Sequence, residues 1–168
     1  MSVVFFGVGA NLGDRVENIG FAISLLEQDN QITVKAVSSL YESAPLGKSD
    51  QPYFINCVVQ INTSLAPHEL LVAVKSIETV MGRELDSHMQ PRPMDIDILL
   101  YDDLNLDSLE LMIPHSRLKT RRFVLEPLLE ITPGVVDPIT SKPLKEFLGD
   151  VKSQKIVKVK SADEVWNG

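Results

Sequence analysis

Two aspartates at alternate positions are the feature of this sequence that most directly indicates chemistry. From Asp95 to Tyr101 the chain alternates and ends in apolar and aromatic residues, which is typical of a β-strand. Side chains on a strand alternate between its faces, so Asp95 and Asp97 share one face, about 6–7 Å apart. Neighbouring carboxylates repel each other and are costly to desolvate, and a divalent cation relieves both effects. The pair therefore predicts a Mg²⁺ site for one or two ions, with a solvent-facing strand edge as the alternative.

Basic side chains gather in the same part of the chain. Arg92 lies three residues before Asp95, close enough to hold a phosphate that bridges metal ions, although a salt bridge to Asp95 is the alternative. His115 lies near Arg117 and Arg121, so it is either a phosphate contact or an ordinary hydrogen-bonded histidine. Together these residues indicate a small phosphorylated ligand that carries metal.

Composition narrows the classes of function. The chain has 168 residues, enough for a single domain over 1–168 with a real core. The net charge is −7 and Lys and Arg form no long block, which opposes binding to nucleic acid or to an anionic membrane. No apolar run approaches the ~20 residues of a membrane span, and residues 1–5 lack the basic start of a signal peptide. The single Cys57 excludes an intrachain disulfide and fits the reducing cytoplasm, where we expect it to be buried by packing.

The order of the expected elements predicts a ferredoxin-like α+β fold. The pattern predicts a strand at 2–8, a helix after Asp14 that ends near Gln28, and strands at 31–43 and 54–61. It then predicts a helix from Pro67 to Gly82 and the strand from Asp95. A shift of phase near Ala36 indicates a bulge. This βαββαβ order predicts a four-stranded antiparallel sheet with two helices on one face. On the last strand, the face opposite the aspartates is expected to carry Met94, Ile96, Ile98 and Leu100.

A C-terminal extension follows this core. Residues 121–131 have helical spacing, and Pro127 within them predicts a short or kinked helix. Residues 144–148 predict one or two further helical turns, and residues 156–160 an edge strand protected by lysines. We expect Trp166 to anchor the chain end.

A glycine-rich segment follows the first strand. Gly7, Gly9 and Gly13 imitate a dinucleotide-binding loop, but such a match alone is weak and a tight turn is the alternative. The backbone of Gly9 and the side chain of Asn11 are candidates for lining a ligand pocket.

Motifs across the chain resemble one enzyme family. They are Gly9-Ala10-Asn11-Leu12, Tyr41–Gly47, Gln51–Asn56, Glu78–Arg83, Pro91–Leu99, Ile113-Pro114-His115 and Arg121–Leu128. With its Arg-x-x-Asp-x-Asp segment, the sequence resembles the 6-hydroxymethyl-7,8-dihydropterin pyrophosphokinases of folate biosynthesis. The resemblance implies the ferredoxin-like fold, ATP as co-substrate, two Mg²⁺ ions, and transfer of pyrophosphate from ATP to the pterin hydroxymethyl group, leaving AMP. We expect a cytoplasmic monomer that acts on small molecules.

The resemblance also implies roles for individual residues. The implied catalytic residues are Arg92, Asp95, Asp97 and Arg121, and the implied metal ligands are Asp95 and Asp97. The implied pterin-binding residues are Ser43, Ala44, Pro45, Leu46, Phe54, Asn56 and Phe123. The implied ATP-binding residues are Glu78, Arg83, Arg92, Ile98, His115 and Arg121. No general base is expected to be essential, because phosphoryl-type transfer relies on alignment and charge neutralisation.

The sequence departs from the family pattern in one loop. Met89 and Gln90 stand where the family usually has an aromatic and a small residue, and the 84–89 loop is one residue shorter, with Leu85 at a position that is often basic. These differences bear on closure over the ligands and leave the metal-binding pair unchanged.

Two other classes of function are alternatives on the sequence alone. One is a two-metal nucleotidyltransferase or cyclase on the same fold, which would release pyrophosphate. The other is a non-catalytic module that binds a ligand or RNA. An RNA-binding version needs a basic and aromatic sheet face with a Lys/Arg-Gly-aromatic motif, and residues 54–61 carry none.

Overall fold

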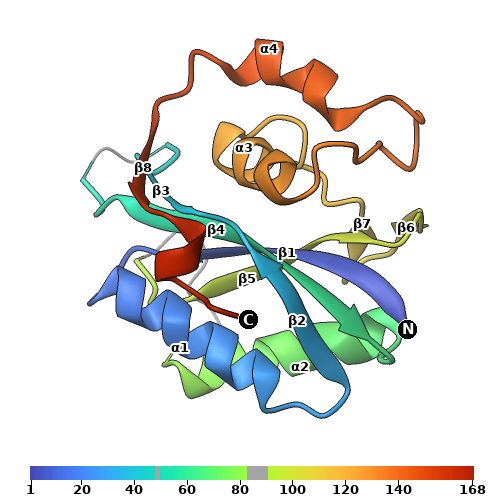
Figure 1. Cartoon of the computed structure of the whole chain (residues 1–168), viewed down its shortest axis with the longest axis horizontal. Helices are drawn as coiled ribbons and strands as arrows, with labels where there is room; N and C mark the ends of the chain where they lie inside the picture. Colours follow the sequence, from blue (N-terminus) through green and yellow to red (C-terminus); the bar gives the residue numbers. More distant parts are fainter. Residues whose placement is uncertain (48–49, 83–90) are drawn as a thin grey trace.

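One antiparallel sheet organises the protein. The computed structural model describes residues 1–47, 50–82 and 91–168. The sheet has six strands in the order β5-β1-β4-β3-β8, with β2 also paired to β4 (Figure 1). Its strands are β1 (Ser2–Ala10), β2 (Ile32–Val37), β3 (Leu40–Ser43), β4 (Phe54–Thr63), β5 (Asp95–Tyr101) and β8 (Ile156–Lys160). The predicted ferredoxin-like order and antiparallel pairing are confirmed, and the sheet is wider than the expected four strands.

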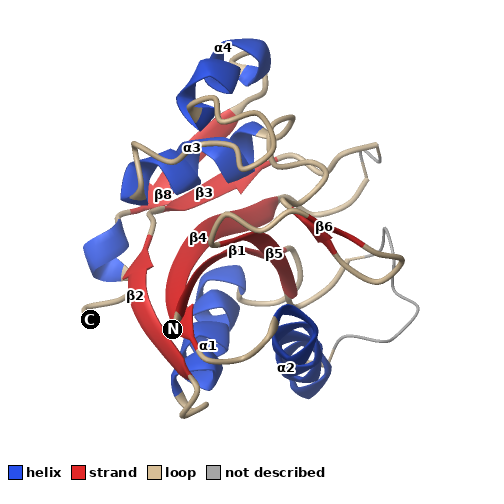
Figure 2. Cartoon of the chain, turned by 90° about the vertical axis from the view of Figure 1, so that its right-hand side faces the viewer, coloured by secondary structure: helices blue, strands red, loops and turns tan. Residues whose placement is uncertain are grey.

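Helices cover both faces of this sheet. Helices α1 (Arg15–Glu27) and α2 (Pro67–Val80) pack on one face, as predicted (Figure 2). Helix α3 (Arg122–Ile131) lies on the opposite face, and η1 (Leu144–Phe147) and α4 (Leu148–Val151) lie beyond it. A two-stranded hairpin, β6 (Leu106–Asp107) with β7 (Met112–Ile113), follows β5. The C-terminal extension is therefore a second layer over the sheet.

Local sequence signals explain where the first two helices begin and end. Asp14 caps α1, because its Oδ1 accepts a hydrogen bond from the Glu17 backbone N–H at 3.0 Å. Helix α2 begins at Pro67 as expected, and its N-cap is Ala66, whose side chain makes no capping hydrogen bond. Glu69 satisfies this helix start instead, because its carboxylate accepts from the Ala66 N–H at 2.8 Å. Gly82, with φ of 89°, follows its last turn.

The long second strand is divided in two. Ser38 and Ser39 separate β2 from β3, and both strands pair with β4. The Ser38 hydroxyl accepts from the Val58 N–H at 2.9 Å, which maintains the connection to β4 at the break. The predicted bulge is confirmed, because the register shifts between Val34 and Ala36.

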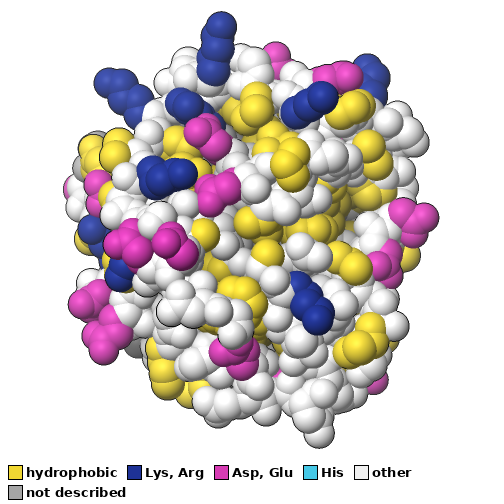
Figure 3. Space-filling model, in the orientation of Figure 1, with side chains coloured by type: hydrophobic (Ala, Val, Ile, Leu, Met, Phe, Trp, Pro, Cys, Tyr) yellow, Lys and Arg dark blue, Asp and Glu magenta, His cyan; other side chains and the backbone are white. Residues whose placement is uncertain are grey.

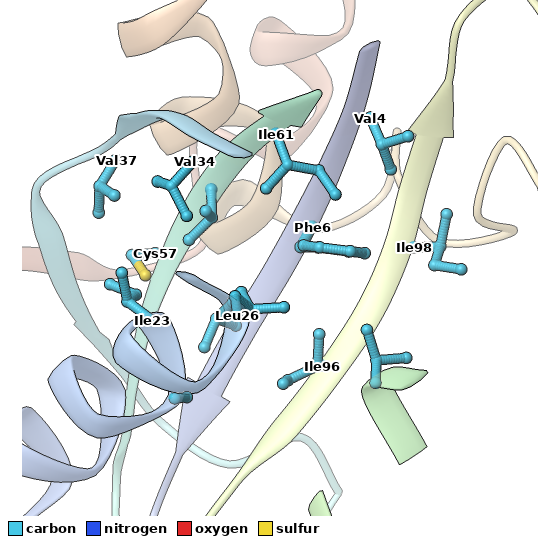
Figure 4. Close-up of a cluster of buried hydrophobic side chains, with 14 of the residues drawn as sticks. Val4, Phe6, Ile23, Leu26, Val34, Val37, Cys57, Ile61, Ile96 and Ile98 are labelled. Carbon is cyan, nitrogen blue, oxygen red and sulfur yellow. The ribbon is translucent and has the colours of Figure 1, made fainter. Parts of the chain in front are cut away.

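Two hydrophobic cores lie on the two faces of the sheet. Figure 4 shows the larger one, where Phe6, Ile96 and Ile98 pack with Ile23 and Leu26 of α1. The second joins the sheet to α3 and contains Phe5, Val58, Leu99, Leu100, Val124, Leu125 and Leu128. The prediction that the Leu100 side chain lies on the same face of β5 as Ile96 and Ile98 was wrong. A register shift against Phe5 and Phe6 of β1 reverses the phase of β5, and Leu100 joins the second core.

The C-terminal residues complete the sheet and contact α1. β8 is the predicted edge strand and pairs with β3. The Trp166 indole N–H donates to the Glu27 carboxylate at 2.8 Å, so this side chain anchors the chain end to α1 as expected. η2 (Ala162–Glu164) lies between these two contacts.

The surface agrees with the acidic composition. Acidic and basic side chains are interspersed on the face in Figure 3, without a large basic patch there. Across the described ranges, none of the helices is both long and apolar enough to cross a bilayer.

A carboxylate near the end of α3 ties that helix to the sheet. Glu130 accepts hydrogen bonds from the Ser39 N–H at 2.9 Å, the Ser39 hydroxyl at 2.7 Å and the Tyr41 hydroxyl at 2.6 Å. Burial raises the pKa of Glu130, but these hydrogen bonds outweigh it and hold the pKa below its ordinary value. The ionised form is therefore the one that fixes α3.

We predict that Glu130→Ala lowers the free energy of unfolding by about 1–2 kcal/mol at pH 7, because buried Ser39 and Tyr41 lose their acceptor. The loss should shrink as pH falls through the folded-state pKa, since a protonated Glu130 accepts these bonds poorly. Urea denaturation measures both effects. Glu126→Ala is the control, because Glu126 pairs with Arg122 on the same helix at 2.7 Å and such a pair contributes about 0.3–0.5 kcal/mol. Equal losses for the two variants would contradict this role of Glu130.

Candidate functional site

A cleft lies on the α3 face of the sheet, over the neighbouring strands β5, β1 and β4. Gly7 and Gly9 of β1, Asn56 of β4, and the two aspartates of β5 line its floor. The start of α3 and the segment after β3 form its walls. The space that it encloses, including open solvent at its mouth, is about 860 Å³.

The acid pair lies in this cleft as predicted. Asp95 and Asp97 stand opposite Gly9 and Gly7 in the β1–β5 ladder, and both side chains line the cleft. Burial raises the pKa of Asp97 to about 7, repulsion from Asp95 adds to this effect, and Lys75 and Arg121 act against it. The pair is thus a site of unfavourable negative charge that a cation would stabilise.

Two arginines line the cleft with the acid pair, and Arg92 contacts it directly. Arg92 Nη2 is 3.2 Å from Asp95 Oδ2, and its guanidinium carbon is 5.7 Å from the centre of the Phe54 ring. The Arg121 guanidinium carbon is 5.6 Å from the centre of the Phe123 ring. The Nε atoms of both arginines are buried without a hydrogen-bond partner among the described residues. Each guanidinium therefore has donors left for an anionic ligand.

His115 completes the charged end of the cleft. Its Nε2 is 3.9 Å from Asp97 Oδ2, and its Nδ1 accepts from the Arg117 N–H at 3.1 Å. Because Nδ1 is the acceptor, the proton of the neutral imidazole lies on Nε2, toward the cleft. Burial and the neighbouring Arg121 lower the pKa of His115, so the neutral form is favoured. A neutral N–H donor facing the acid pair can bind a phosphate oxygen.

A second part of the cleft lining, around Asn56, suits a flat ring with polar edges. Asn56 Nδ2 donates to the Ser43 hydroxyl at 2.8 Å, and both side chains are buried. The rings of Phe54 and Phe123 line the same space. The remaining predicted residues of this subsite, Ala44, Pro45 and Leu46, also line the cleft. Two aromatic rings beside a buried amide fit a heteroaromatic ligand with hydrogen-bonding edges.

The glycines have a different role from the one the sequence suggested. Gly7 and Gly9 lie within β1 and not in a turn, so the expected loop begins later. A Cβ on Gly9 would lie 2.9 Å from Asn56 Oδ1, and one on Gly7 would lie 3.3 Å from a Leu99 methyl group. The glycines therefore leave room on the cleft floor for side chains of the neighbouring strands. Gly9 lines the cleft, where a ligand pocket was expected from the sequence.

Two residues expected at the ATP end, Ile98 and Glu78, are not among the described residues that line this cleft. Ile98 is buried in the core on the α1 and α2 face. Glu78 is buried, and its carboxylate accepts from the Ile96 N–H at 2.7 Å and pairs with Lys75 at 3.0 Å. Glu78 thus supports the strand that carries the aspartates. Arg83 lies outside the described residues, as do Leu85, Met89 and Gln90.

The structure adds residues that the sequence did not single out. Gln51, Leu99 and Val124 line the cleft. Asn11, expected at the pocket, instead bonds the backbone of Arg92 and of Pro52. No sequence signal pointed to Leu99 or Val124, because both resemble ordinary core residues.

The two carboxylates of the acid pair can supply some of the ligands of a metal ion. Within the part of the chain that the structure describes, no group of three or more His, Cys, Asp or Glu side chains has the geometry of a metal site. Two adjacent carboxylates nevertheless fit Mg²⁺, because this ion is usually held by one or two carboxylates together with substrate phosphates. An acid pair beside two arginines and a histidine, on an open antiparallel sheet, defines a class of sites that handle metal-bound phosphate groups.

Comparison with known proteins identifies the family. The family model 7,8-dihydro-6-hydroxymethylpterin-pyrophosphokinase (HPPK) matches residues 5–133. A protein of Aquifex aeolicus named 2-amino-4-hydroxy-6-hydroxymethyldihydropteridine pyrophosphokinase is 44% identical over 147 residues, which cover 88% of this chain and 91% of that protein. A Bacillus subtilis protein of the same name is 41% identical over 140 residues, covering 83% and 84%. The chain belongs to the HPPK family.

Longer proteins contain a similar unit. The folic acid synthesis protein fol1 of Schizosaccharomyces pombe is 43% identical over 168 residues, so 99% of this chain matches only 23% of that protein. A crystal structure of Plasmodium falciparum HPPK-DHPS with pteroate matches with a TM-score of 0.71 at 19% identity, covering 90% of this chain and 42% of that chain. The second comparison supports the fold alone.

We predict that stability depends on pH through Asp97. Its folded-state pKa lies above the unfolded value, so the folded state binds more protons between about pH 4 and 7 and loses stability as pH rises through that window. Asp97→Asn removes this loss. Without added metal, it should raise the free energy of unfolding by about 1–2 kcal/mol more at pH 8 than at pH 4, after discounting for solvent screening.

Urea denaturation at the two pH values, in the presence of EDTA, measures this difference. Asp103→Asn, at an exposed position just beyond β5, should show no such dependence. An equal effect of Asp97→Asn at pH 4 and pH 8 would contradict the raised pKa.

Proposed function

We propose that this chain transfers the terminal diphosphate of ATP to the hydroxymethyl group of 6-hydroxymethyl-7,8-dihydropterin, giving AMP and the pterin diphosphate, in folate biosynthesis. The observation that carries the proposal is one cleft that combines two kinds of lining. Asp95, Asp97 and two arginines form its charged part, and Asn56 with Phe54 and Phe123 forms its aromatic part, where the two rings also contact the arginines. Membership of the HPPK family and the names of the Aquifex and Bacillus relatives support the same reaction.

The pterin occupies the aromatic end in this proposal. Phe54 and Phe123 lie against its ring faces, and buried Asn56 bonds the polar edge of the ring. Ser43 supports Asn56 through its hydroxyl, and the backbone of Ala44, Pro45 and Leu46 borders the ring. This placement directs the hydroxymethyl group toward the acid pair.

ATP occupies the charged end. Arg92, Arg121 and His115 all line the cleft, and in this proposal they bind phosphate oxygens. Arg83 is proposed to contact the nucleotide, and support for it is the sequence resemblance. Glu78 and Ile98, expected at the nucleotide, are buried and are proposed instead to support the strand that carries the acid pair.

Mg²⁺ is the metal that the donor set favours, and Asp95 and Asp97 would hold it. Two ions are proposed, because two carboxylates together with a triphosphate supply enough oxygen ligands. When bound, Mg²⁺ neutralises phosphate charge and lowers the pKa of the attacking alcohol.

The reaction needs alignment more than proton transfer. The hydroxymethyl oxygen forms a bond to the β-phosphorus, the bond from that phosphorus to the α,β-bridging oxygen breaks, and AMP leaves with the electron pair. The alcohol proton passes to solvent. Arg92 and Arg121 stabilise charge on the leaving side, and the aromatic end keeps the alcohol in line with the breaking bond. No side chain is assigned as a general base.

We further propose that residues 1–168 act as one domain and as a monomer in the cytoplasm, without nucleic-acid or membrane partners. Support for one domain is that β1, near the start of the chain, and β8, near its end, belong to the same sheet. The net charge of −7 supports small-molecule partners over nucleic acid.

The test is product analysis with ATP, Mg²⁺ and 6-hydroxymethyl-7,8-dihydropterin. We predict that AMP forms only when the pterin is present. We also predict that Asp97→Ala lowers turnover by about 10²-fold or more, because charge neutralisation by the metal is worth several kcal/mol. The unfolding transition of this variant should stay cooperative.

Asp103→Ala is the matched control and should keep the wild-type rate, since Asp103 is exposed. Release of pyrophosphate from ATP would instead indicate a nucleotidyltransferase or cyclase. Ligand binding without any turnover would indicate a non-catalytic module. Near wild-type AMP release by Asp97→Ala would contradict the metal assignment.

A further inference from the structure

Asn11 is a buried polar residue that does not line the cleft. It follows the last residue of β1, and only 1% of its surface is exposed. Its side-chain Oδ1 accepts from the Arg92 N–H at 2.8 Å, and its own N–H donates to the Arg92 carbonyl at 3.2 Å. Its Nδ2 also donates to the Pro52 carbonyl at 3.4 Å. One side chain thus connects β1 to two segments that border the site.

The sequence around Arg92 explains why these bonds matter. Pro91 and Pro93 lack a backbone N–H, so Arg92 supplies the only N–H donor of residues 91–93. The ladder between β1 and β5 ends at the pair Gly9 and Asp95, before it reaches Arg92. Asn11 therefore continues the pairing past the end of the ladder, with its side chain in the place of a backbone acceptor.

The Arg92 side chain depends on that backbone position. Its guanidinium lies between Asp95, with a 3.2 Å contact, and the Phe54 ring, and only 16% of the side chain is exposed. A shift of the Arg92 backbone would move the guanidinium away from the phosphate end of the cleft. Misplacement of a reacting or stabilising group by about 1 Å can cost about 10²-fold in rate.

We infer that Asn11 is a positioning residue for the diphosphate transfer, which holds the Arg92 guanidinium in place by fixing the Arg92 backbone. The inference rests on the proposed function. Asn11 touches neither substrate subsite through its side chain, so its effect on the reaction passes through Arg92. The Pro52 bond adds a tie to the segment next to Gln51, which lines the cleft.

The experiment compares three variants by the rate of AMP formation in single turnover, with enzyme in excess over ATP. Asn11→Ala removes both side-chain bonds and should lower the rate constant at least about tenfold. Asn11→Asp keeps the acceptor for the Arg92 N–H but replaces the Nδ2 donor to the Pro52 carbonyl with a carboxylate oxygen, so it should lose less than Asn11→Ala. Asn18→Ala is the matched control. Asn18 bonds the Leu12 carbonyl at 3.0 Å in the same turn, and its loss should leave the rate unchanged.

A double-mutant cycle separates positioning from general stability. In an Arg92→Lys background, Asn11→Ala should cost less than about twofold, because the group that Asn11 positions has already been replaced. A purely structural role would give the same loss in both backgrounds. Thermal unfolding of each variant measures any loss of fold.

The outcomes are distinct. A rate for Asn11→Ala within twofold of wild type, or equal losses in the two backgrounds, overturns the inference alone. Should Asn11→Ala not fold, Asn11→Asp takes its place in the double-mutant cycle: equal losses in the wild-type and Arg92→Lys backgrounds overturn the inference, and a smaller loss in the Arg92→Lys background supports it. A wild-type protein that forms no AMP overturns the proposed function and the inference with it.

Discussion

Repulsion between two adjacent carboxylates is the constraint around which this structure is arranged. Asp95 and Asp97 lie on the same face of one strand, and burial together with their mutual repulsion raises the pKa of Asp97 to about 7. Nearby cations reduce this cost without removing it, since Arg92 contacts Asp95 while Arg121 acts on Asp97 from a distance. A pair held in this state gains stability from a divalent cation and a phosphate, which is the property that the proposed reaction requires.

The division of the sheet into two faces makes this arrangement possible. One face is closed by α1 and α2 over the larger core, which keeps the strands in register. Helix α3 packs on the other face through the second core, and β1, β4 and β5 contribute residues that line the cleft on that face. Because α3 is tied to the sheet through Glu130, its first turn holds Arg121 and Phe123 at this cleft. The packing of the helices on the sheet thus both stabilises the fold and positions the residues of the site.

Periodicity and capping signals in the sequence were sufficient for most of the fold. Asp14, Pro67 and the alternation after Asp95 each marked an element that the structure contains. Features that depend on contacts between distant residues were not predictable in the same way. The phase of Leu100 is set by a bulge against β1, and the position of α3 on the far face is set by the second core.

The sequence indicated the charged residues of the cleft more readily than the residues that hold them in position. Asp95, Asp97, Arg92 and His115 are recognisable by type and spacing, because few other residues supply that chemistry. Asn11 and Glu78 act through the backbone of other segments, and no local pattern reveals which backbone atom a buried amide or carboxylate will meet. The same holds for Gly9, whose missing side chain matters only because Asn56 lies beside it.

A crystal grown with Mn²⁺ in place of Mg²⁺ and with a non-hydrolysable ATP analogue is the most direct test of the central claim. Anomalous scattering then locates the metal independently of the protein atoms. The account predicts metal coordinated by carboxylate oxygens of Asp95 and Asp97 and by phosphate oxygens, with Arg92 and Arg121 on the same phosphates. Nucleotide bound in the cleft with no metal between the two aspartates, or with both carboxylates turned away from it, would contradict the account.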